Sequence, residues 1–281
     1  MSVTRLVVTA VIAGPIVLAA AEAPSVDSAL HSMYNFDFGE AHRTLDNLIQ
    51  ANPRDPLPYA FRASAYLFSE LDRLQILEGE FLADDQKIIE KKKQKLDPDP
   101  IVRQRFIAAM NDAMSRGEAA VQSNPNDTNA LFAMCIAQGV NTDYMALVER
   151  RQMSSLSPAR RSNNYAQRLL KLDPTFYDAY LTAGFSEYMV GSLPFFVKWF
   201  VHFDNVSGSK ERGISNLQLA ASNGHYFRPF AKILLGIVAL REKRPLDAQK
   251  LLAELSRDYP RNPLFRKELA KITTKLGMAS N

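Results

Sequence analysis

The stretch from Gly39 to Ala63, GEAHRTLDNLIQANPRDPLPYAFRA, decides the fold class. It has the pattern of one helix that ends at an Asn-Pro step and a second helix that begins directly after it. A small residue, Ala41, lies twelve positions before Pro53, and Tyr59 and the small Ala63 lie six and ten positions after it. Small residues let two helices approach closely, and the large residue fills the space between neighbouring pairs. The stretch therefore predicts an antiparallel pair of helices.

The same register recurs at two further Asn-Pro or Asp-Pro steps and, more weakly, at Pro260. The matching residues are Ala113, Leu131 and Cys135 around Pro125, Ser162, Tyr180 and Gly184 around Pro174, and Ala248, Leu252 and Leu255 before Pro260. This register resembles the tetratricopeptide repeat (TPR), a pair of helices in about 34 residues. The resemblance implies an all-α, right-handed helical-repeat solenoid. Because the prolines are unevenly spaced, we expect inserted helices and roughly seven helix pairs in all.

Periodicity and stop signals predict where the helices lie. The expected helices span residues 26–34, 39–51, 57–72, 101–123, 128–139, 158–172, 176–188, 214–222, 226–241, 245–257 and 263–275. In this interpretation Ser157 and Pro158 cap and start the helix that runs to Leu172. Insertions over 71–96, 141–156 and 191–209 interrupt the repeats.

Residues 1–23 have the pattern of an export signal. Arg5 precedes an apolar run over residues 6–21, and small residues between Ala19 and Ala23 offer a cleavage site. The run of about 16 residues is shorter than the roughly 20 that a spanning helix needs. We therefore expect a cleaved signal peptide, with a retained N-terminal anchor as the alternative. Residues 24–281 would then form a single helical-repeat domain in the periplasm or outside the cell.

The composition argues against several classes of protein. A net charge of +4 from 34 basic and 30 acidic residues does not favour a nucleic-acid partner. The single cysteine, Cys135, allows no internal disulfide and falls on a small packing position. The four histidines lack metal-binding spacing, and neither a phosphate-binding loop nor a Gly-x-Ser-x-Gly elbow occurs. We therefore expect no enzyme activity, no cofactor and no metal.

The candidate partner-binding residues are Arg62, Tyr66, Gln138 and Glu187. Three of them, Arg62, Gln138 and Glu187, replace apolar or aromatic residues of the repeat, so we expect them on the solvent side of the concave face. That face would hold a protein or peptide partner, as in a scaffold of the cell envelope. We expect Arg62→Ala and Glu187→Ala to weaken partner capture and to change the melting temperature by no more than about 2–4 °C.

A second candidate surface is an aromatic helix over residues 194–203. Trp199, Phe200 and Phe203 fall on one face of it, together with Phe195 and Phe196. This face either plugs the core or forms a wall for an apolar ligand, a partner helix or a membrane surface. The alternative function is therefore a carrier or sensor of an apolar small molecule or lipid.

The residues that follow this helix carry a second resemblance. The run comprises Leu193-Pro194, Lys198, Phe203, Gly208, Gly213, Leu217, Ala220, Gly224, Pro229, Ala231 and Leu234. It is similar to the central block of eukaryotic TPR proteins of the inclusion-body-clearance type. That resemblance implies ties to membranes and lipid handling, and so favours an apolar ligand.

Overall fold

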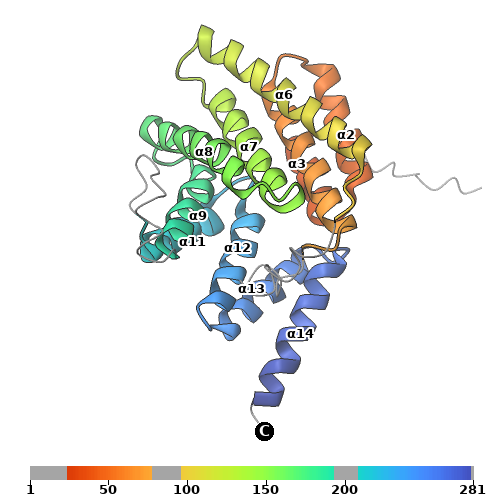
Figure 1. Ribbon diagram of the computed structural model, residues 1–281, viewed down its shortest axis with the longest axis vertical. Helices are drawn as coiled ribbons and strands as arrows, with labels where there is room; N and C mark the ends of the chain where they lie inside the picture. The colour runs from red at the N-terminus through yellow and green to blue at the C-terminus, as the bar shows by residue number, and fades with distance from the viewer. Residues whose placement is uncertain (1–23, 78–95, 193–207, 280–281) are drawn as a thin grey trace, which may run out of the picture.

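The computed structural model describes residues 24–77, 96–192 and 208–279 (Figure 1). Their α-helices are α1 (Val26–Tyr34), α2 (Phe38–Ala51), α3 (Pro56–Arg73), α6 (Pro100–Ser123), α7 (Thr128–Asp143), α8 (Gln152–Leu172), α9 (Ala179–Ser192), α11 (Lys210–Asn223), α12 (Arg228–Arg241), α13 (Pro245–Asp258) and α14 (Pro263–Ala279). A π-helical segment, η1 (Tyr144–Val148), follows α7. These residues contain no strand, which confirms the all-α prediction for this part of the chain.

Consecutive helices pack against each other along the chain, and α3 packs on both α6 and α7 (Figure 1). Aspartates hold several of the corners between them. Asp55 accepts a hydrogen bond from the Leu57 amide at 3.0 Å, and Asp127 accepts one from the Ala130 amide at 2.9 Å. Such caps satisfy amides that the first helical turn leaves without partners. The local sequence therefore sets where α3 and α7 begin.

The small positions of the repeated register are buried, as predicted. Six of them expose at most 2% of their surface, namely Ala41, Ala63, Ala113, Cys135, Ser162 and Ala248. The helices α9 and α11 approach each other closely. A Cβ atom added to Gly213 would lie 2.5 Å from the Tyr188 nitrogen and 2.8 Å from the Gly184 carbonyl oxygen. Only glycine fits where these two backbones meet.

The longest apolar helix in the described part of the chain spans Thr128–Val148 and includes α7 and η1. By length and composition it could cross a membrane, but most of it is buried inside the fold. It contacts α3, α6 and α8. Its apolar character is therefore explained by its place in the core.

Two ends of the described chain meet in what we call the closure contact. The Asn262 side-chain amide donates to the Tyr34 carbonyl oxygen at 2.8 Å, and the Arg261 amide donates to the Asn35 side chain at 3.1 Å. The rings of Tyr34 and Tyr259 lie 5.2 Å apart. The corner between α13 and α14 is thereby joined to the corner between α1 and α2.

Three predicted helix starts are wrong. One is that of α11, which begins at Lys210 rather than at residue 214, with the Ser209 side chain as its N-cap. The helix α8 begins at Gln152, and Pro158 lies inside it rather than at its first turn. Pro158 is buried, so the packing of α8 offsets the backbone hydrogen bond that proline cannot make. The helix α9 begins at Ala179 because turns occupy the residues between Asp173 and Ala179. In the first of these turns the Thr175 amide donates a hydrogen bond to the Asp173 carboxylate at 2.8 Å.

Candidate functional site

The inner face of α3 and α7 is filled by the chain's own aromatic side chains. Residues at the start of α12 meet residues of the two helices, and this inner aromatic cluster comprises Phe61, Phe68, Phe132, Tyr226, Phe227 and Phe230. The ring centroids of Phe227 and Phe132 are 5.5 Å apart, and those of Phe68 and Phe230 are 5.4 Å apart. Such pairs add to the stability gained from apolar burial. The chain's own side chains therefore cover this inner face of α3 and α7.

Asp178 holds the segment that covers this face. Its carboxylate accepts hydrogen bonds from the Phe227 amide at 2.7 Å and from the His225 amide at 3.1 Å. Burial raises the pKa of Asp178, and the backbone amides oppose that rise. The carboxylate thus does for α12 what an N-cap side chain does elsewhere.

Gln138 is buried, so the expectation that it faces solvent is wrong. Its side-chain oxygen accepts from Arg161 Nε at 3.0 Å, and its side-chain nitrogen lies 3.3 Å from the sulfur of Met114. A buried amide is tolerated when its polar atoms have partners. Gln138 therefore joins α7 to α8 and α6.

Glu187 is also buried, which again contradicts the expected exposure. Its carboxylate accepts from the Ser209 amide at 3.1 Å and from Arg212 at 3.3 Å. A buried carboxylate needs such hydrogen bonds because the loss of its hydration costs on the order of several kcal/mol. Glu187 therefore ties α9 to the beginning of α11.

Arg62 and Tyr66 are half-buried on the side of α3 that faces α2. Arg62 forms an ion pair with Asp46 at 2.7 Å, and the Tyr66 ring lies 4.1 Å from the His42 ring. Burial, and then the Arg62 charge, lower the pKa of His42 to about 4. Both candidate residues thus have partners within the fold.

The structure does not gather the predicted residues into one site. Arg62 and Tyr66 face α2, Gln138 lies among α6, α7 and α8, and Glu187 lies between α9 and α11. Trp199, Phe200 and Phe203 lie outside the described residues. The prediction of an aromatic binding face over 194–203 therefore stays a prediction.

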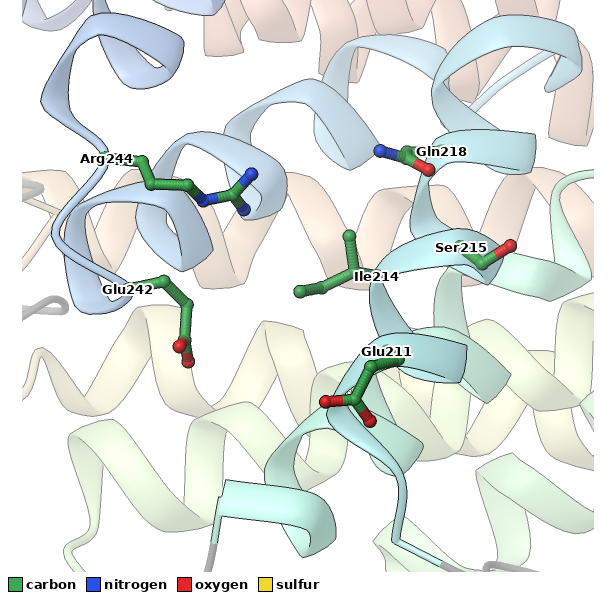
Figure 2. Close-up of a pocket in the computed structure, with 6 residues that line it drawn as sticks. All are labelled: Glu211, Ile214, Ser215, Gln218, Glu242 and Arg244. Atoms are coloured by element: carbon green, nitrogen blue, oxygen red, sulfur yellow. The ribbon is translucent and has the colours of Figure 1, made fainter.

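One hollow, which we call the α11 groove, has a volume of about 440 Å³. Figure 2 shows its two walls, one on α11 and one on the corner between α12 and α13. The lining residues are Glu211, Ile214, Ser215, Gln218, Glu242 and Arg244. Glu242 is held by Lys210 at 2.8 Å and by the Tyr188 hydroxyl at 3.0 Å. The spacing of the four α11 residues places them on one helical face.

A second hollow, which we call the α1 cavity, has a volume of about 540 Å³. It lies beside the closure contact. Its walls are Ser25, Asp27, Ser28, Leu30, His31, Tyr34, His225, Tyr226, Pro229 and Tyr259. No local pattern could have revealed this cavity, because its walls come from three distant segments of the chain. The sequence carries only a weak sign of the α11 groove, namely a helical face on which polar residues surround one apolar residue.

The described residues include no group of three or more His, Cys, Asp and Glu side chains that could hold a metal ion. Cys135 is buried, and burial raises the pKa of its thiol. Burial also raises the pKa of Asp143 to about 7.

No family model, curated protein or solved structure matches the chain. Its function is therefore inferred from residues and geometry.

Proposed function

We propose that this chain is a non-enzymatic binding or scaffold protein, built as a right-handed, TPR-like helical-repeat array, that holds a protein or peptide partner. The recurring register of small residues, buried where helices meet, supports the repeat interpretation. The export pattern of residues 1–23 supports a place in the periplasm or outside the cell. Serial helix pairs of this kind use their surfaces chiefly for binding.

The α11 groove is the partner surface in this proposal, and its composition is the observation that carries it. Ile214 lies at its centre and is half-buried, while Ser215 and Gln218 beside it are exposed (Figure 2). An apolar centre with a polar rim is the composition of protein interfaces. On the inner face of α3 and α7, Phe227 and Phe230 pack against the aromatic side chains of those two helices.

The charges of the groove favour a partner segment with a basic residue beside an apolar one. Glu242 is already paired with Lys210, and Arg244 is paired with Asp247 at 3.3 Å. Glu211 is exposed and accepts a hydrogen bond from the neutral Ser209 hydroxyl at 3.0 Å. Hydrogen bonds from its own amide and from Ser209 lower the pKa of Glu211, so it is ionised at neutral pH. It can therefore pair with a cation of the partner.

A displayed library of random peptides, selected on the full chain, tests this function. We expect the selected peptides to share an apolar residue next to Lys or Arg. Their affinity should fall about tenfold or more in Ile214→Asp, because a central apolar contact is lost. Glu211→Gln should relax the preference for the basic residue.

Ile101→Asp is the control for the introduced charge, since Ile101 is an exposed isoleucine on α6. It should bind the selected peptides as the parent chain does. Equal binding to Ile214→Asp, or a library that yields no binder, would contradict the assignment. The alternative, a carrier of an apolar molecule or lipid that uses residues 194–203, depends on residues outside the described ranges.

A further inference from the structure

The α1 cavity lies where three segments meet: one side of α1 along its whole length, the start of α12 and the corner between α13 and α14. Its volume of about 540 Å³ lies within the range of small-molecule sites, roughly 300–1,000 Å³. None of its wall residues lines the α11 groove. Its chemistry can therefore be considered separately from that of the proposed partner surface.

Aromatic rings form much of the cavity wall. Tyr34 and Tyr259 lie with their ring centroids 5.2 Å apart, tilted by 46°, and His31 lies 5.5 Å from Tyr259. The Tyr34 hydroxyl donates to the Tyr226 carbonyl oxygen at 3.2 Å, which fixes the first ring. Fixed aromatic rings around a cavity attract cations through the negative potential of their faces.

Asp27 supplies a negative charge at the cavity. One of its carboxylate oxygens lies 2.8 Å from His225 Nε2. Burial raises the pKa of Tyr226, and the nearby Asp27 and then Asp178 raise it further, so these negative charges act on the Tyr226 ring. Burial and then Asp258 raise the pKa of Tyr259, and Arg228 opposes them with a smaller effect. The acidic charges thus prevail at both rings.

The backbone amides at the two helix starts beside the cavity are already used. Ser25 and Ser28 bond each other at the start of α1: the Ser25 amide donates to Ser28 Oγ at 3.0 Å, and the Ser28 amide donates to Ser25 Oγ at 3.1 Å. At the start of α12, the amides of His225 and Phe227 donate to Asp178. Helix N-termini often bind anions, but here side-chain oxygens of the chain already occupy the amides.

We propose that the α1 cavity binds a small organic cation with an alkylated ammonium head, held against the rings of Tyr34 and Tyr259, with Asp27, which also contacts His225, as its countercharge. The aromatic faces select the diffuse charge of such a head, and Leu30 and Pro229 contact its carbon atoms. The shared chemistry is a trimethylammonium group, whether on a free solute or on a lipid headgroup.

Calorimetric titration of the full chain with choline tests the proposal. Tetramethylammonium should also bind, because it carries the same charged head. The neutral carbon analogue, 3,3-dimethylbutan-1-ol, should bind at least about fivefold more weakly, since it lacks the charge that the rings attract. Equal binding of choline and its neutral analogue, or no binding of either cation, would overturn the proposal.

Two variants locate the site. Asp27→Asn and Tyr259→Leu should each weaken choline binding by about five- to tenfold. Asp247→Asn is the matched control for the charge, since Asp247 does not line the cavity, and it should leave choline binding unchanged. Asp27 is largely exposed, so Asp27→Asn stays folded and decides the question if Tyr259→Leu is destabilised. Unchanged affinity in Asp27→Asn would contradict the assigned countercharge.

Sedimentation with phosphatidylcholine vesicles distinguishes the two sources of the ammonium group. Vesicle binding that free choline displaces assigns the cavity to a lipid headgroup, whereas choline binding without vesicle binding assigns it to a free solute. Loss of peptide binding in Ile214→Asp, with choline binding intact, would show that the two sites are independent.

Discussion

At the scale of single residues, Glu187 shows how a charged side chain becomes part of the packing between helices. It takes the place of an aromatic residue in the repeat register, and its carboxylate is almost fully buried. The Ser209 amide and Arg212 then supply the hydrogen bonds that water would otherwise give. A departure from an apolar pattern is therefore no sign of exposure when a donor lies within reach.

This environment reverses the expectation for Glu187→Ala. Removing the carboxylate leaves the half-buried Ser209 amide without this partner, so we expect the free energy of unfolding to fall by about 1–3 kcal/mol. Glu118→Ala, at an exposed glutamate of α6, should change it by no more than about 0.5 kcal/mol. Urea denaturation of both variants measures the difference. Equal stability of the two would show that Glu187 does not hold α9 to α11.

At the scale of elements, glycines decide how closely helices approach. Gly213 lies where α11 crosses α9, and an added Cβ would lie 2.5 Å from the Tyr188 nitrogen. Gly236 in α12 has no such neighbour: its added Cβ would meet no atom within 4 Å. The absence of a side chain is therefore required at Gly213 but not at Gly236.

Alanine substitutions at these two positions should have opposite effects. Gly213→Ala should destabilise the fold by about 1–3 kcal/mol, because backbone atoms cannot give way to the methyl group. Gly236→Ala should stabilise it by about 0.4–1 kcal/mol, because it restricts the unfolded chain without a clash. Thermal melting of the two variants gives the comparison. A Gly213→Ala variant as stable as the parent would mean that α9 and α11 can separate freely.

The sequence predicted most helices because their signals are local. The Asn-Pro and Asp-Pro steps mark corners within a few positions, and the spacing of small residues marks the buried faces. The candidate site was predicted poorly for the opposite reason. Whether Gln138 is exposed depends on Arg161, and whether the inner face is open depends on Phe227, which is remote in sequence.

At the scale of the whole molecule, the closure contact joins residues that lie 228 positions apart. Asn262 is fully buried, and its side chain forms hydrogen bonds with residues of α1 and of α14. Its side-chain nitrogen donates to the Tyr34 carbonyl, and its side-chain oxygen accepts from the Leu264 amide at 2.9 Å to cap α14. One side chain thus couples the first described helix to the last.

Asn262→Asp separates these two roles. The aspartate keeps an oxygen for the cap of α14 but loses the donor to Tyr34, so α1 should open more readily. We expect amide hydrogen exchange over residues 26–34 to accelerate about tenfold, for a loss of roughly 1.4 kcal/mol. Asn223→Asp, at an exposed asparagine of α11, is the control. Unchanged exchange in α1 would show that the closure contact does not hold it.

The inner aromatic cluster also has a consequence for the order in which the chain is made. Phe61 and Phe132 belong to the first half of the chain. Tyr226 and Phe227, which cover them, come nearly a hundred residues after Phe132. A growing chain must therefore leave apolar rings uncovered until its last quarter has been synthesised. A chain that stops short of α12 would expose those rings permanently, and truncation should produce aggregation rather than a shorter stable array.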